Sequence, residues 1–142
     1  MVIPIAILIT IMLIFPAQVE IDEEITLRDL LYGLLLRSGN DAAIEIANCI
    51  AGSMDEFVKM MNDKAKNLGM ENTTFINSSG LKKKKKLGNT STAYDMALLM
   101  SYAIDNKTFV EISGTKRHIA TTNYKTYDWY NKNKLLTRYK YT

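Results

Sequence analysis

The 142-residue sequence has one cysteine, one histidine, one tryptophan and two prolines. A single cysteine excludes an intrachain disulfide and a zinc site made of several cysteines. Because His118 is the only histidine, a metal site built on imidazole ligands is also not expected. The net charge of +3 is too small to indicate a nucleic-acid partner by itself. We therefore expect neither a metal centre nor nucleic-acid binding.

The composition is that of one folded domain. Hydrophobic residues make up 47% of the chain and charged residues 23%, a balance that argues against overall disorder. Five adjacent lysines occupy residues 82–86, just after the turn at Gly80. Because like charges repel one another and pack poorly, we expect these lysines to form a solvated loop tip. Binding of a nucleic acid or of an anionic surface through the lysines is the alternative.

The N-terminal segment differs in kind from the rest of the chain. Residues 2–15, VIPIAILITIMLIF, contain Thr10 as their only polar residue. The segment is shorter than the roughly 18–20 residues that span a bilayer, and it is typical of the apolar part of a secretory signal, although no Lys or Arg precedes it. We interpret residues 1–18 as a signal-like or anchor segment. A buried element of the domain and an artefactual start are the two alternatives.

Beyond residue 24 the apolar residues recur at the one-face spacing of helices. The four predicted helices begin after Thr26, near Asn40, after Ser53 and after Thr92. Three of these starts are capping boxes, which pair Thr26 with Asp29, Ser53 with Glu56, and Thr92 with Asp95. A short helical turn is predicted near residues 107–113. Gly69 is expected to end the third helix.

The C-terminal part is rich in Thr, Tyr and β-branched residues, with Asn and Asp as punctuation. This composition predicts one or two strands after Lys116, followed by a loop at residues 131–134. A short strand is also predicted at residues 73–76. Cys49 is expected to be a buried unreactive thiol, and His118 is expected to have a structural or exposed role in a strand. Trp129 and its neighbouring tyrosines are expected to pack beside the Asn-Lys-Leu-Leu stretch at residues 133–136.

The stretch LRSGNDAA, residues 36–43, places small and polar residues between two apolar helices. One interpretation is purely structural: Gly39 takes the left-handed conformation that ends a helix, and Asn40 or Asp41 caps the next helix. The other interpretation is catalytic. Serine acyl-transferases that bind penicillin combine S-x-x-K, S-x-N and K-T-G elements around one cleft, and Ser38-Gly39-Asn40 matches the second element.

The resemblance extends far beyond these three residues. The stretch ITLRDLLYGLLLRSGNDAAIEIANCIAGSMDEFVKMMNDKAKNLGMENTTFINSSGL resembles the D-alanyl-D-alanine carboxypeptidases of the penicillin-binding protein class, and STAYDMALLMSYAI and NKNKLL follow in the same order. The similarity covers roughly residues 20–138. It implies a helix-rich α+β domain at residues 19–142 with part of the serine β-lactamase-like fold. It also implies that Ser38 and Asn40 are catalytic, Ser38 as proton relay and Asn40 as the contact to the substrate amide.

The same resemblance implies a substrate and a location. Family enzymes remove the terminal D-alanine of peptidoglycan stem peptides ending in D-Ala-D-Ala through an acyl-enzyme, which water hydrolyses without a metal or cofactor. The complete enzymes also bind β-lactams. We therefore expect a bacterial protein that is secreted or lies at the extracytoplasmic face of the cytoplasmic membrane.

Two family elements have no convincing counterpart in this chain. Residues 1–37 contain no serine, so an S-x-x-K upstream of Ser38 is missing, and no K-T-G follows the NKNKLL stretch. The formal S-x-x-K matches at Ser79 and Ser113 come in the wrong order and lack a following helix. We therefore expect a chain truncated at both ends and inactive by itself. The alternative is a non-catalytic remnant, a peptidoglycan-binding module or a membrane-attached interaction protein.

Overall fold

The structure is a computed structural model that describes residues 19–20, 24–81 and 88–138. The elements in chain order are β1 (Val19–Glu20), β2 (Glu24–Ile25), α2 (Leu27–Arg37), α3 (Asn40–Ala51), α4 (Met54–Asn67), α5 (Ala93–Ile104), α6 (Lys107–Gly114), β3 (Arg117–Thr121), β4 (Thr126–Tyr130) and α7 (Leu135–Arg138). The helix-rich α+β class predicted from the sequence is confirmed. The predicted signal-like segment and the lysine run both lie outside the described residues.

Helices α2, α4 and α5 begin at the predicted capping residues. The backbone N–H of Asp29 donates to the Thr26 hydroxyl (3.0 Å), and that hydroxyl donates to the Asp29 carboxylate (2.6 Å). Ser53 and Thr92 accept in the same way from the third residue of α4 and of α5. These bonds satisfy backbone donors that have no partner inside the helix, so local chemistry sets three of the helix starts.

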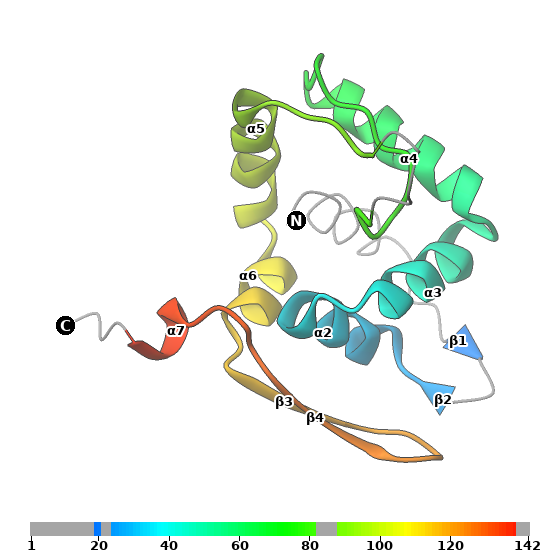
Figure 1. Ribbon diagram of the computed structural model, residues 1–142, viewed down its shortest axis with the longest axis vertical. Helices are drawn as coiled ribbons and strands as arrows, with labels where there is room; N and C mark the ends of the chain where they lie inside the picture. Colours follow the sequence, from blue (N-terminus) through cyan, green and yellow to red (C-terminus); the bar gives the residue numbers. More distant parts are fainter. Residues whose placement is uncertain (1–18, 21–23, 82–87, 139–142) are drawn as a thin grey trace.

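The helices share one core, in which α2 is the central element. It packs against α3, α6 and both strands of the hairpin β3–β4, and α3 in turn packs against α4 (Figure 1). The core residues with almost no exposed surface include Leu36, Ala43, Ile46, Phe57, Met61, Phe75, Leu99 and Ile112. Among the described residues no helix has the length and the apolar character needed to cross a membrane.

The antiparallel hairpin β3–β4 lies against α2 with one face (Figure 1). Its inner face carries His118, Ala120, Tyr127 and Trp129, whereas Arg117, Asp128 and Tyr130 are exposed. Trp129 packs over Gly33 of α2, where an added Cβ would lie 3.2 Å from the indole Cη2 atom. The prediction that Trp129 packs beside residues 133–136 is therefore incomplete, because Gly33 of α2 provides the surface on which the indole packs.

The segment between α4 and α5 has little regular structure. The strand predicted at residues 73–76 is wrong, since only an isolated bridge joins Thr74 to Thr90. Side chains hold the segment instead. The carboxylate of Asp95, which is 1% exposed, accepts from the Asn72 N–H (2.9 Å) and from the Thr73 hydroxyl (2.6 Å). Asp95 thus acts as an anchor for this loop in addition to its place in the first turn of α5.

Candidate functional site

A sharp joint separates α2 from α3, as the sequence predicts. Helix α2 ends at Arg37, and Ser38 takes the left-handed conformation (φ 59°, ψ 44°) while its N–H donates to the Leu34 carbonyl at 2.9 Å. Gly39 is extended (φ −64°, ψ 114°), and α3 begins at Asn40. One continuous helix through residues 27–50 is therefore excluded.

The details of the joint differ from the structural interpretation of the sequence. Ser38, not Gly39, is the left-handed residue, and it is the only non-glycine residue with positive φ in the described part of the chain. Gly39 itself is the N-cap of α3 and makes no side-chain cap bond, so the expected cap by Asn40 or Asp41 is wrong. A Cβ at Gly39 would lie 3.1 Å from the Asp41 carboxylate and 3.4 Å from the Gly33 carbonyl. Close packing, rather than positive φ, explains this glycine.

The side chains of Ser38 and Asn40 are not used to hold the joint. Ser38 is half-buried and Asn40 is exposed, and neither side chain has a hydrogen-bond partner among the described residues. Backbone bonds alone close the end of α2. Both side chains therefore remain available to bind another group.

The last residue of β4 and the segment that follows it hold the last turn of α2 through hydrogen bonds. The Lys132 N–H donates to the Leu36 carbonyl (3.0 Å), and the Arg37 guanidinium donates to the Tyr130 carbonyl (3.3 Å). Next to them, the Asn131 amide donates to two carbonyls at the end of α6. The last turn of α2, directly before the joint, is therefore tied to the end of the hairpin, and these bonds fix the position of the joint.

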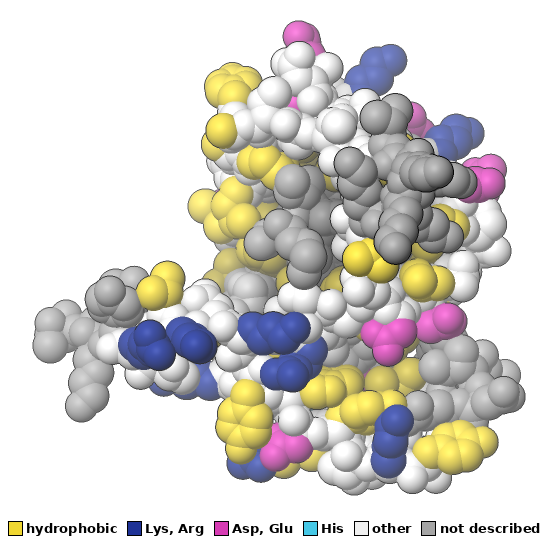
Figure 2. All heavy atoms as spheres, in the orientation of Figure 1, with side chains coloured by type: hydrophobic (Ala, Val, Ile, Leu, Met, Phe, Trp, Pro, Cys, Tyr) yellow, Lys and Arg dark blue, Asp and Glu magenta, His cyan; other side chains and the backbone are white. Residues whose placement is uncertain are grey.

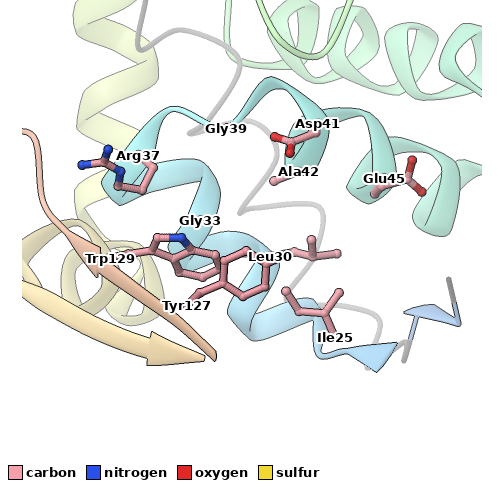
Figure 3. A pocket seen from close by; sticks show the side chains of 10 residues that line it. All are labelled: Ile25, Leu30, Gly33, Arg37, Gly39, Asp41, Ala42, Glu45, Tyr127 and Trp129. Carbon is pink, nitrogen blue, oxygen red and sulfur yellow. The ribbon is translucent and has the colours of Figure 1, made fainter. Parts of the chain in front are cut away.

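A pocket of about 400 Å³ opens beside the joint (Figure 3). Its lining comes from β2, α2, α3 and β4 and comprises Ile25, Leu30, Gly33, Arg37, Gly39, Asp41, Ala42, Glu45, Tyr127 and Trp129. Gly39 belongs to this lining, but Ser38 and Asn40 do not. That the latter two side chains face one common cleft stays a prediction.

The two formal S-x-x-K matches do not resemble nucleophile sites. Ser113 lies in the last turn of α6 and donates its hydroxyl to the Val110 carbonyl at 3.3 Å. Ser79 lies in a turn, where its hydroxyl accepts from the Leu81 N–H at 3.2 Å. In the described part of the chain no helix starts at either serine.

The remaining reactive side chains have structural surroundings. His118 Nε2 lies 2.6 Å from the Asp29 carboxylate, and its ring stacks on Tyr32 with centroids 3.6 Å apart. This contact ties the hairpin to the start of α2, and no local sequence pattern predicts it because the partners are 89 positions apart. Cys49 is only half-buried rather than buried, yet burial raises the pKa of its thiol and so disfavours the reactive thiolate. No group of three potential metal ligands occurs among the described residues.

Comparisons with known proteins support the resemblance inferred from the sequence. Residues 12–142 match the family described as D-alanyl-D-alanine carboxypeptidase. The chain is 39% identical over 121 residues to D-alanyl-D-alanine carboxypeptidase DacF of Bacillus subtilis, covering 84% of this chain and 30% of that protein. It is 35% identical over 135 residues to the D-alanyl-D-alanine carboxypeptidase of Streptomyces sp. strain K15, covering 87% of this chain and 45% of that protein.

Solved structures agree with this assignment. A single-site variant of the Streptomyces K15 DD-transpeptidase superposes with a TM-score of 0.82 at 28% identity, covering 96% of this chain and 65% of that one. The D-alanyl-D-alanine carboxypeptidase of Mycobacterium tuberculosis H37Rv gives a TM-score of 0.78 at 28% identity, covering 96% and 59%. The predicted partial fold of this class is thereby confirmed, and the chain spans less than half the length of either curated relative. The chain belongs to the D-alanyl-D-alanine carboxypeptidase family.

Proposed function

We propose that residues 19–142 form the middle of a serine D-Ala-D-Ala carboxypeptidase domain and supply its S-x-N element. In the complete domain Ser38 relays a proton between the nucleophile and the leaving group, and Asn40 binds the amide of the substrate. The substrate is a peptidoglycan stem peptide ending in D-Ala-D-Ala, and the enzyme acts outside the cytoplasm, either secreted or at the outer face of the cytoplasmic membrane. The family membership and the geometry of the joint support this proposal.

The observation that carries the proposal is the left-handed backbone of Ser38. A residue with a Cβ is disfavoured there, and glycine or asparagine would end the helix at lower cost. Strained residues persist where the surrounding structure holds them, and they cluster at active sites. Because the Ser38 hydroxyl also has no partner among the described residues, a role in chemistry explains the serine better than a role in capping.

Ser38 is poorly suited to be the nucleophile itself. A serine hydroxyl becomes nucleophilic when an adjacent base removes its proton. Three residues after Ser38, where S-x-x-K carries its lysine, the chain has Asp41, and Ala42 follows, so no lysine is present at this spacing to act as the base. General-base help of this kind is typically worth about 10² to 10⁴ in rate. The chain by itself should therefore not form an acyl-enzyme.

Incubation of the purified chain with a fluorescent penicillin, followed by intact-mass measurement, tests this expectation. We expect no covalent adduct. A stoichiometric adduct would contradict the proposal, and peptide mapping to Ser79 or Ser113 would show that a formal S-x-x-K match is functional.

A chimera tests the assigned roles directly. Residues 26–138 of this chain would be joined to the flanking segments of B. subtilis DacF, whose aligned region is 39% identical. We expect penicillin labelling, a rate reduced by about 10²-fold or more in Ser38→Ala and Asn40→Ala variants, and an unchanged rate for Ser101→Ala, an exposed serine of α5. Equal labelling of the Ser38→Ala chimera would refute the relay role. A folded chimera that fails to label would favour the alternative of a non-catalytic, peptidoglycan-binding or membrane-attached protein.

A further inference from the structure

We propose that basic side chains at the end of α2 and over α7 bind a linear polyol phosphate, a polymer that carries one phosphodiester in each repeat and no bases. These side chains are Arg37, Lys116, Lys132, Lys134 and Arg138, and together they are called the basic band. All of them are exposed, and the set includes no residue of the S-x-N element. The choice of a polymer without bases rests on the proposed function, which is carried out outside the cytoplasm.

Backbone hydrogen bonds bring three separate segments together in the basic band. The Lys132 N–H donates to the Leu36 carbonyl (3.0 Å), directly before Arg37 at the end of α2. One position earlier, the Asn131 N–H donates to the carbonyl of Lys116 (2.9 Å), which precedes β3. The end of α2, the start of β3 and the segment after β4 therefore meet at this surface.

Helix α7 extends the basic band outward, since it projects from the body of the domain (Figure 1). The Arg138 N–H donates to the Lys134 carbonyl (3.0 Å), so these two cations lie one helical turn apart on the same face. The Leu135 N–H donates to the Asn133 side chain (3.1 Å), which fixes the start of the turn. Figure 2 shows basic side chains in a row from the end of α2 outward over α7, whereas acidic ones lie over α3. A row of cations suits an extended chain of anions.

The cations of the basic band have no carboxylate partner among the residues that the structure describes. The three ion pairs of that part of the chain involve Arg28, Arg117 and His118 instead. The Arg37 guanidinium donates to the Tyr130 carbonyl (3.3 Å), a neutral group that orients it without neutralising its charge. Guanidinium and ammonium groups are common partners of phosphate oxygens. A polyanion bound along the basic band therefore supplies the missing negative charges.

A polymer fits the basic band better than a lipid bilayer does. Attachment to a bilayer surface depends on a sizeable buried apolar area in addition to basic residues. Leu135 and Tyr130, exposed to 58% and 55%, lie next to the basic band, but two side chains and a helix of four residues provide little such area. A polyanion needs no apolar contact, because the release of its counterions drives binding.

Fluorescence anisotropy of an end-labelled poly(glycerol phosphate) decamer, titrated with the purified chain, tests the proposal. The titration is repeated with a chain that carries Lys→Gln substitutions at residues 82–86, because these adjacent lysines also attract polyanions. Removal of five positive charges takes the net charge from +3 to −2, so binding then requires a local basic surface. We expect both chains to bind at about 50 mM salt, with a dissociation constant on the order of 10⁻⁵ M. Labelled maltodecaose, a neutral oligomer, should not bind.

Two double variants in the Lys→Gln background locate the binding surface. We expect Lys132→Gln/Lys134→Gln to weaken binding by about tenfold. The slope of log dissociation constant against log salt should fall by about 1.4, since each phosphate contact to a single strand contributes about 0.7. The matched control, Lys59→Gln/Lys66→Gln, removes two exposed lysines of α4, which lies far from α7 (Figure 1), and should bind like its parent. Circular dichroism confirms that each variant is folded.

Three outcomes would overturn the proposal. The first is the absence of saturable decamer binding by the chain with the Lys→Gln substitutions. The second is an equal loss of affinity in both double variants, which would reduce the effect to overall charge. The third is tighter binding, at equal phosphate concentration, of an oligothymidylate or of phosphatidylglycerol vesicles, which would identify a nucleic-acid or a membrane surface instead. Penicillin labelling tests the proposed function separately, so failure of one proposal is distinguishable from failure of the other.

Discussion

The contact between Gly33 and Trp129 gives the most direct test of how the hairpin is attached to α2. A Cβ at Gly33 would lie 3.2, 3.4 and 3.5 Å from three atoms of the indole six-membered ring. An alanine requires the indole to shift by a few tenths of an ångström, and replacing a mid-helix glycine gains about 1 kcal/mol in helix propensity. We therefore expect Gly33→Ala to be nearly neutral.

Valine at the same position should behave differently. Its two additional methyl groups have to enter space that the indole occupies, and overpacking of this kind typically costs about 1–3 kcal/mol. After the smaller propensity gain of valine is subtracted, we expect Gly33→Val to lower the free energy of unfolding by about 1–2 kcal/mol. For a chain of this size the midpoint of thermal unfolding then falls by roughly 3–8 °C.

Two readouts separate this local effect from a general loss of helix stability. Thermal unfolding gives the stability, and the emission of Trp129 should shift to the red as the indole is displaced into water. The control is Gly114→Val. Gly114 is the last residue of helix α6, and a Cβ there would meet nothing within 4 Å. If Gly33→Val unfolds at the same temperature as Gly114→Val with unchanged emission, the hairpin does not depend on this contact.

Three further perturbations test other parts of the structure. Asp95→Ala should lower the free energy of unfolding in urea by about 2–4 kcal/mol, because it removes a buried charged acceptor of two loop donors; a loss under about 1 kcal/mol would contradict the anchor role. The bidentate contact of Arg117 lowers the pKa of Asp128, so its stabilising effect is complete above the ordinary pKa of aspartate and is lost as the pH falls through the lowered value. The melting difference between the parent and Asp128→Asn should accordingly shrink in strong acid, and a constant difference would contradict this. Alkylation of Cys49 should be slower at neutral pH than that of a free thiol, because burial raises its pKa; an equal rate would show full access.

The features that the sequence predicted well are set by neighbouring residues. The caps at Thr26, Ser53 and Thr92 each depend on a partner three positions away, and all three bonds form as expected. The break after residue 37 was predicted because small and polar residues interrupt an apolar pattern. These signals are contained in one turn of helix, where intrinsic preferences and short-range hydrogen bonds dominate.

The features that the sequence did not predict depend on distant partners. Asp95 looked like a capping residue only, and its bonds to Asn72 and Thr73 arise because the loop folds back over the start of α5. The pocket combines residues from β2, α2, α3 and β4, which no local pattern brings together. The intrinsic preference of glycine predicts the left-handed conformation at Gly39. In the structure Gly39 instead packs closely against Asp41 and the Gly33 carbonyl, and Ser38 takes the left-handed conformation.

The backbone of Ser38 also bears on how this protein would respond to laboratory selection. A residue held at φ 59° gains stability from exchange to glycine or asparagine, because both tolerate this conformation better than serine does. A library of variants that is screened only for expression or heat resistance should therefore lose Ser38 early. The selected variants would be more stable against unfolding but would lack the hydroxyl group. An attempt to stabilise this fold accordingly has to keep serine at position 38. Stabilising substitutions have to be sought at other positions, for example on the exposed face of the hairpin.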